Sequence, residues 1–315
     1  MNSGWNAGFT TAKKETMEAA KRRHIKRETK TFVIEGLEAW GPQEIKQQLG
    51  LRIMEDLRAD RLELRPLPEA ALRLAELARD PDPSIDDAVA ALEQDPALAS
   101  RVLKVAASPA VSRRPPADLS QAAMAVGVHQ LRDMAFAIAS GRVFRAPGLD
   151  DQVKGEHAHS FCVGVATAEM FKRMGIGSKQ GFLVGMLHDI GALLLYTALS
   201  QYGREEPALL EPLFVRRARG ILHAALGEKV IRSWGLGETV RAGAKYHHAP
   251  NTAGALTQVA LAVSIADHAA KLEAEDEDDR TEQLSQFAPL YAAGLSPADA
   301  KGIAKVVQVA LDEGA

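Results

Sequence analysis

The chain has 315 residues and a formal net charge of −3, so the molecule as a whole is not a binder of polyanions. Hydrophobic residues make up 46% of the sequence, enough for a sizeable core, while aromatic residues make up only 5%. This composition favours closely packed helices over a β-sandwich, because β-sheets draw on aromatic and β-branched side chains. The single cysteine, Cys162, excludes an internal disulfide and a cysteine-cluster metal site, and it fits the reducing cytoplasm.

The beginning of the chain is polar and basic. It carries no apolar run of signal-peptide type, and no stretch of about 18 apolar residues anywhere is free of charge. We therefore expect a cytoplasmic protein without a membrane span. Residues 1–40 are expected to form a basic, partly helical extension. Its basic stretch, 13–30, could be a solvated helix face, or it could contact nucleic acid, an acidic lipid or an acidic partner.

Helical spacing and cap residues predict helices throughout the first half. Ser84 with Asp87 three residues later is a capping-box variant, and Asp95-Pro96 places a cap before a proline at the first helical position. Residues 62–68 should be extended, because proline restricts the residue before it. The predicted helices cover 42–58 and 68–79, begin at Ser84 and at Asp95, and cover 119–126 and 131–143.

The second half also has helical spacing, and glycines mark the expected helix ends. The predicted helices cover 153–174, 179–200, 205–219, 223–234, 238–248 and 255–273, with end signals at Gly175, Gly177, Gly220, Gly235 and Gly237. Residues 273–282 read as an acidic loop, and Ser296-Pro297 begins a final helix. No useful period-2 alternation and no internal repeat is present. The sequence therefore predicts an all-α fold.

The most informative pair in the chain is His188-Asp189, between an apolar stretch and Gly191. Divalent Mg, Mn, Fe and Zn accept imidazole nitrogen together with carboxylate oxygen. On one helix the two side chains would point about 100° apart, so the remaining ligands must come from flanking helices. His159 and Asp267 complete a predicted metal set. His223, His247 and His248 could hold a second metal or a phosphate.

Two alternatives to this metal set stay open at the level of sequence. His188-Asp189 could be a capped or core-satisfied pair that holds no metal. His157 competes with His159 for the first ligand position, and His159 is preferred because it leads directly into an apolar helical stretch. Ser160 has no nucleophile elbow around it, and no glycine-rich phosphate loop is present, so a serine hydrolase, an NTPase or a dinucleotide enzyme is not expected.

These motifs together resemble the HDOD family, the HD-related output domain of bacterial signalling proteins within the HD phosphohydrolase superfamily. The resemblance covers roughly residues 60–272, and the run 182–191 around His188-Asp189 is its strongest marker. The further markers, in family order, are 61–69, 95–103, 123–131, His159-Ser160, His223, 234–236, His247-His248 and Ala266-Asp267.

The resemblance implies two helical lobes and a regulatory role. We expect an HDOD domain over 41–272, with an N-terminal helical lobe over about 60–145 and an HD-like helical bundle over about 150–272. An acidic loop and a C-terminal helix would follow over 273–315. We also expect a stand-alone form, without a receiver, sensor or separate output domain.

Two departures from the family bear on activity. The chain has Ala107-Ser108 where the family usually has Asn-Ser, which removes a cap or an interlobe hydrogen bond. It has Ala192 where the family usually has lysine after His-Asp-Ile-Gly, and a lysine there could contact phosphate as a point charge. Like the family, the chain also lacks the Gly-Tyr-Pro signature of the related cyclic-dinucleotide phosphodiesterases. The loss of the lysine argues against phosphohydrolase activity but leaves the metal ligands untouched.

Three functions therefore remain. The favoured one is a non-catalytic signalling module that binds a partner protein or a nucleotide second messenger. The second is a metal-dependent phosphohydrolase or phosphodiesterase acting on a nucleotide or cyclic dinucleotide, with the metal on His159, His188, Asp189 and Asp267. The third is an adaptor that uses residues 13–30 on a nucleic acid or membrane surface. The short basic stretch and the negative net charge count against the third.

Overall fold

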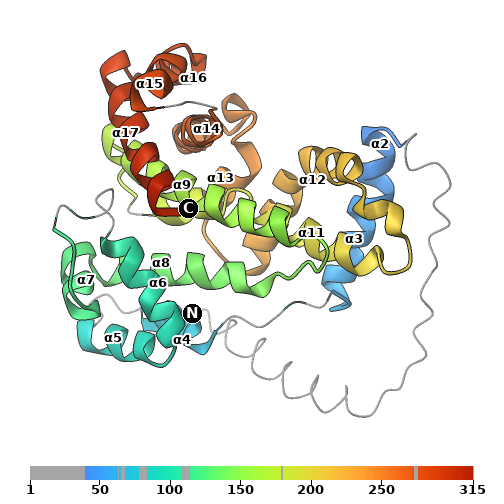
Figure 1. Ribbon diagram of the computed structural model, residues 1–315, viewed down its shortest axis with the longest axis horizontal. Helices are drawn as coiled ribbons and strands as arrows, with labels where there is room; N and C mark the ends of the chain where they lie inside the picture. The colour runs from blue at the N-terminus through green and yellow to red at the C-terminus, as the bar shows by residue number, and fades with distance from the viewer. Residues whose placement is uncertain are drawn as a thin grey trace. The chain divides into compact units, whose positions relative to one another are not determined.

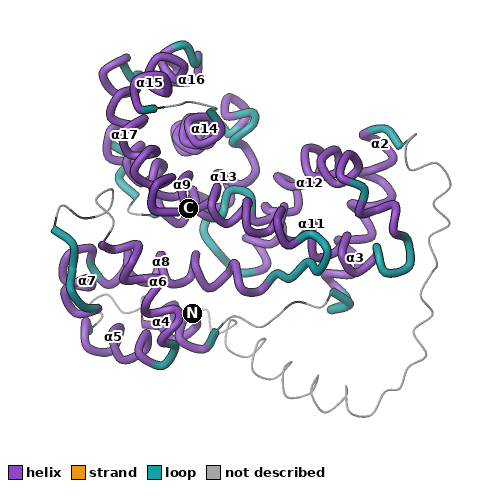
Figure 2. Tube along the Cα trace, in the orientation of Figure 1, coloured by secondary structure: helices purple, strands orange, loops and turns teal. Residues whose placement is uncertain are grey.

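The computed structural model describes residues 40–315, except 63, 65–67, 78–83, 108–111, 113, 179, 273–275 and 315. Within this described part every regular element is a helix (Figure 2), which confirms the prediction of an all-α fold. The basic extension predicted over residues 1–40 lies outside the described residues, apart from Trp40.

The helix predicted over 42–58 is present as three consecutive helical segments. They are α2 (Pro42–Glu44), the π-helical turn η2 (Ile45–Gly50) and α3 (Leu51–Arg58). Ile45, Leu49 and Ile53 are spaced by four and fully or almost fully buried, so one face of this helix forms part of the core. Figure 1 shows this helix beside α12 (Pro212–Ser233), which is far from it in the sequence. The Trp40 ring meets the Phe214 ring of α12 edge-on at a centroid distance of 6.3 Å.

The next helices pack on one another and form the N-terminal group in Figure 1. They are α4 (Glu69–Leu77), α5 (Ile85–Glu93), α6 (Pro96–Ala107), α7 (Leu119–Val126) and α8 (Val128–Ser140), followed by the 3-10 turn η3 (Gly141–Val143). Both predicted caps are confirmed: Ser84 Oγ accepts from the Asp87 N–H at 3.4 Å, and Asp95 Oδ1 accepts from the Leu98 N–H at 2.9 Å. Gly127, at φ +84°, turns the chain within one residue, so α8 begins earlier than the predicted 131.

The remaining helices build the group that carries the candidate ligands. In chain order they are α9 (Asp150–Arg173), α10 (Gly181–Met186), α11 (Ile190–Tyr202), η4 (Pro207–Leu210), α12, α13 (Glu238–Tyr246), η5 (Pro250–Thr252), η6 (Gly254–Leu256) and α14 (Thr257–Lys271). Gly175 and Gly235 adopt φ of +64° and +67° just after α9 and α12, which confirms the two predicted helix ends.

Two predicted boundaries in this group are wrong. The single helix expected over 179–200 is interrupted at residues 187–189, which form a turn between α10 and α11. The helix end expected at Gly220 does not exist, because α12 runs through it without a break. Ala218 and Leu222 on either side are buried, and their packing outweighs the roughly 1 kcal/mol that a helical glycine costs relative to alanine.

The C-terminal segment is more helical than the predicted acidic loop. Residues 277–282 of that loop belong to α15 (Glu277–Ser285), because Asp276 caps it by accepting from the N–H groups of Asp278 and Asp279. Acidic residues in the first turn also complement the helix dipole. A short unpredicted α16 (Ala288–Ala292) follows, and α17 (Pro297–Gly314) begins at the predicted Ser296-Pro297. These helices gather around α14, and α17 packs along α9 (Figure 1). The domain boundaries predicted from the sequence stay predictions.

One described segment, residues 181–202, is apolar and long enough to cross a membrane by length and composition alone. However, 94% of its most apolar window is buried inside the domain, and it bends at residues 187–189. Burial and the bend identify it as the core segment α10–α11.

The contact of α11 with α12 is close enough to allow no side chain at Gly191. A methyl group there would overlap the His223 carbonyl oxygen and the Gly227 nitrogen, which are backbone atoms and cannot rotate away. We predict that Gly191→Ala lowers the free energy of unfolding by about 2–3 kcal/mol or more in urea titrations followed by circular dichroism. Gly220→Ala, in the open middle of α12, is the control and should be neutral or raise stability by up to about 1 kcal/mol. Equal behaviour of the two variants would contradict the close packing.

Candidate metal centre

The turn at residues 187–189 presents His188 and Asp189 side by side in the interior. Both side chains are completely buried, and His188 Nε2 lies 3.3 Å from Asp189 Oδ2. The carbonyl oxygen of Gly185 can only accept, so His188 Nδ1, at 2.7 Å, carries the proton. The break in the helix therefore removes the angular separation that an uninterrupted helix would impose, and it turns His188 Nε2 toward the carboxylate.

His159 from α9 and Asp267 from α14 complete the first predicted group. One ligand atom from each of the four residues lies within 4.8 Å of every other. Asp267 Oδ1 lies 2.9 Å from His159 Nε2 and 3.3 Å from His188 Nε2. His157, the competing candidate, instead has its ring against Gly141. The sequence-based preference for His159 therefore agrees with the geometry.

His223, His247 and His248 form the second group, again within 4.8 Å of one another. His223 Nε2 lies 2.9 Å from His248 Nε2 and 3.4 Å from His247 Nε2. Asp189 joins the two groups, because its Oδ1 lies 3.3 Å from His223 Nε2 and 3.4 Å from His247 Nε2. All seven residues predicted for the site thus form one cluster, and their roles as metal or phosphate ligands stay predictions.

Backbone carbonyls orient the other two buried imidazoles as they orient His188. His223 Nδ1 donates to the Arg219 carbonyl at 2.6 Å, and His247 Nδ1 lies 3.0 Å from the carbonyls of both Gly243 and Ala244. Each ring therefore turns its Nε2 toward Asp189. Metal-binding histidines have this arrangement, with the second nitrogen bonded to an outer acceptor.

Two buried atoms at the centre of the cluster have no hydrogen-bond partner, and this bears on whether a metal fits. His188 Nε2 and Asp189 Oδ1 are buried and make no hydrogen bond. An unpartnered buried polar atom costs about 1–3 kcal/mol, and a cation between them would satisfy both. The donors are imidazole nitrogens and carboxylate oxygens, the set that suits Zn, Fe and Mn. The residues therefore fit a divalent metal.

Burial and neighbouring charges set the protonation states of the cluster. Burial disfavours the His188 imidazolium, but the Asp189 and Asp267 carboxylates outweigh burial and raise its pKa to about 10. Burial raises the pKa of Asp267, but the hydrogen bond with His159 and the nearby charges of His188 and Lys271 outweigh burial and lower that pKa far below its usual range. Burial lowers the pKa values of His223 and His248 to about 4 each. At neutral pH the Asp189 and Asp267 carboxylates are therefore ionised and the His223 and His248 imidazoles neutral, the forms that bind metal, whereas His188 carries a second proton that a bound metal would displace.

The residues that bind the carboxylates of Asp189 and Asp267 from outside the cluster were not predicted from the sequence. Arg219, one helical turn before His223, donates from Nη2 to Asp189 Oδ2 at 2.6 Å. The same guanidinium binds the buried Glu156 of α9 through Nε and Nη2, at 3.0 Å each. Lys271 Nζ lies 2.7 Å from Asp267 Oδ2. The spacing of four residues in Asp267–Lys271 and Arg219–His223 was visible in the sequence, whereas nothing linked Glu156 to Arg219, 63 residues away.

The arrangement defines which residues would hold an ion and what it would supply. His159, His188, Asp189 and Asp267 would hold one divalent metal, and the three remaining histidines a second metal or a phosphate. Such an ion, when bound, lowers the pKa of a bound water and polarises a phosphoryl oxygen.

A comparison with protein-family models decides the family. The model of the HDOD domain matches residues 64–250, more than half of the chain. The chain belongs to the HDOD family. The matched range of this HDOD protein begins in the link before α4 and ends just beyond His248, so it contains every predicted ligand except Asp267.

Solved structures share the fold of this HDOD protein. A "Putative metal-dependent phosphohydrolase" from Shewanella amazonensis SB2B aligns with a TM-score of 0.64 and 21% identity, covering 86% of this chain and 100% of that chain. An HDOD domain protein of unknown function from Geobacter sulfurreducens aligns at 0.59 with 23% identity, over 85% and 99%. A "Putative signal transduction protein" from Marinobacter aquaeolei VT8 aligns at 0.56 with 20% identity, over 87% and 64%. No curated protein matches the chain.

The buried Glu156–Arg219 pair is expected to contribute to the stability of the protein. Glu156→Gln removes the charge that faces a largely desolvated guanidinium, and we expect it to lower the free energy of unfolding by about 3 kcal/mol. Glu238→Gln removes the same charge from an exposed pair with Arg241 and should change stability by less than about 1 kcal/mol. Urea unfolding at one pH measures both. A Glu156→Gln protein as stable as the Glu238→Gln protein would show that the buried pair does not hold α9 to α12.

Proposed function

We propose that this HDOD protein is a cytoplasmic bacterial signal-transduction protein whose HD-like site holds a divalent metal and binds a nucleotide second messenger through its phosphate. The response would pass to a protein partner. The observation that carries the proposal is the pair of unpartnered buried atoms, His188 Nε2 and Asp189 Oδ1, at the centre of seven converging candidate ligands. Manganese, iron, magnesium and zinc are the candidate ions.

Binding without turnover is favoured by position 192. Ala192 lies in the first turn of α11 and is fully buried, so the place where the family usually carries a lysine offers no cation. The name of the Marinobacter neighbour, with its reference to signal transduction, supports the same reading.

Hydrolysis of a phosphoester at the same site is the second candidate. It is favoured by the convergence of the whole predicted ligand set, and by the name of the Shewanella neighbour, which refers to a metal-dependent phosphohydrolase. The two candidates share the metal and differ in turnover. Product formation from nucleotides and cyclic dinucleotides by the metal-loaded protein would select hydrolysis, and saturable binding with no product would select the regulatory function.

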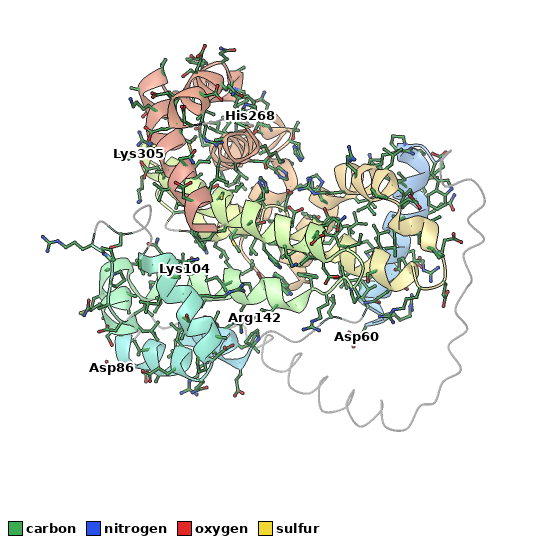
Figure 3. The ribbon with its side chains drawn as sticks, viewed as in Figure 1. Asp60, Asp86, Lys104, Arg142, His268 and Lys305 are labelled. Carbon is green, nitrogen blue, oxygen red and sulfur yellow. The ribbon has the colours of Figure 1, made fainter. Side chains whose placement is uncertain are left out.

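Metal content tests the part that both candidates share. We expect the purified full-length protein to carry about one or two ions per chain by elemental mass spectrometry, and Asp189→Ala to lose them because that carboxylate contacts both ligand groups. Asp86→Ala is the matched control: Asp86 is exposed and points outward from α5 (Figure 3). Circular dichroism should show that both variants fold. A wild-type protein that stays empty after loading with Mn²⁺, Fe²⁺, Mg²⁺ and Zn²⁺ would contradict the proposal.

A further inference from the structure

Of the described residues, Arg219 is one of two cations that lie at the boundary of the cluster with solvent, and it is the one that binds Asp189. Its side chain keeps 24% of its surface exposed, whereas the Glu156 and Asp189 side chains that it binds are 5% and 0% exposed. A ligand that arrives from solvent would therefore meet the Arg219 side chain before it meets Asp189.

The guanidinium is also fixed in orientation. Glu156 accepts from Nε and Nη2, and Asp189 accepts from Nη2, so neither carboxylate holds Nη1. An arginine anchored along one edge loses little further conformational entropy when its remaining donors bind a planar or tetrahedral oxyanion. This geometry suits phosphate, whose oxygens accept from an arginine fork through short, charge-assisted hydrogen bonds.

The charge of the site depends on Arg219. Among the described residues, the carboxylates of Glu156, Asp189 and Asp267 face two cationic side chains, Arg219 and Lys271, so the cluster has one net negative charge when its imidazoles are in the neutral, metal-binding form. One divalent ion changes this to one net positive charge. Without Arg219 the same loaded site would be neutral and would attract an anion much less strongly.

We propose that Arg219 is the phosphate-contacting residue of this site, supplying from α12 the cation that position 192 of α11 lacks. The inference rests on the proposed function, since it assigns the anion subsite of the same metal centre. Lys271 is the other cation, but its ammonium is bound to Asp267 alone, and its side chain is 40% exposed on a flexible stem. Arg219 touches Asp189, the carboxylate shared by both ligand groups.

Phosphate titration of the metal-loaded protein tests the assignment. The full chain is stripped of metal and reloaded with Mn²⁺, the manganese content is measured, and inorganic phosphate is titrated by calorimetry. We expect Arg219→Gln to keep the manganese content and to bind phosphate roughly tenfold more weakly or worse, the effect of losing one hydrogen bond to a charged group. Arg219→Lys should fall between this variant and the wild type.

Two further variants separate contact from charge. Arg216→Gln removes an exposed charge from the same helix and should bind phosphate as the wild type does. Lys271→Gln removes the same charge from the site and should weaken phosphate binding less than Arg219→Gln. If Arg219→Gln fails to fold because Glu156 is left unpaired, the double variant Glu156→Gln/Arg219→Gln takes its place and should show the same loss.

The outcomes distinguish the two claims. Equal phosphate affinity of manganese-loaded wild-type and Arg219→Gln proteins would overturn the role of Arg219 and leave the metal centre standing. A wild-type protein that takes up no manganese but binds phosphate through Arg219 would overturn the metal centre alone. A wild-type protein that binds no phosphate, with or without manganese, would overturn the anion subsite.

Discussion

The structure of the site depends on one buried carboxylate, that of Asp189. An ionised carboxylate without contact to water needs compensating charge and hydrogen bonds. Arg219 satisfies Oδ2, and the Nε2 atoms of His223 and His247 face Oδ1 without donating to it, since their protons sit on Nδ1. The protein thus satisfies one oxygen of the Asp189 carboxylate, Oδ2, and leaves the other, Oδ1, for a cation.

Close helix packing and ligand orientation come from the same glycines. A Cβ at Gly185 would clash with the Val163 carbonyl oxygen of α9, and the Gly185 carbonyl accepts the His188 proton. Gly243 likewise packs against Val184, and its carbonyl lies 3.0 Å from His247 Nδ1. Side chains at either position would separate the helices and shift the carbonyls that set the tautomers. The fold and the chemistry of the centre are therefore coupled through backbone atoms.

Local signals predicted local structure, and contacts between distant residues escaped prediction. The caps at Ser84 and Asp95 could be predicted because the capping oxygen and the N–H group that donates to it lie within three residues of one another. The turn at 187–189 was missed because the apolar run on both sides of it has the composition of one buried helix. The Arg219–Glu156 contact joins two helices whose pairing no single sequence reveals. The order of the motifs predicted the seven candidate ligands, but the outer partners that set their charge could be found only in the structure.

X-ray absorption at the metal edge tests the central claim most directly, because it reports the ligands of the ion itself. For the manganese-loaded full-length protein we predict a nitrogen and oxygen first shell, with the outer-shell scattering of several imidazoles and no sulfur. Loss of that imidazole signal in His188→Ala would assign the ion to this cluster. A spectrum of oxygen ligands alone, unchanged by His188→Ala, would contradict the account and place the ion elsewhere.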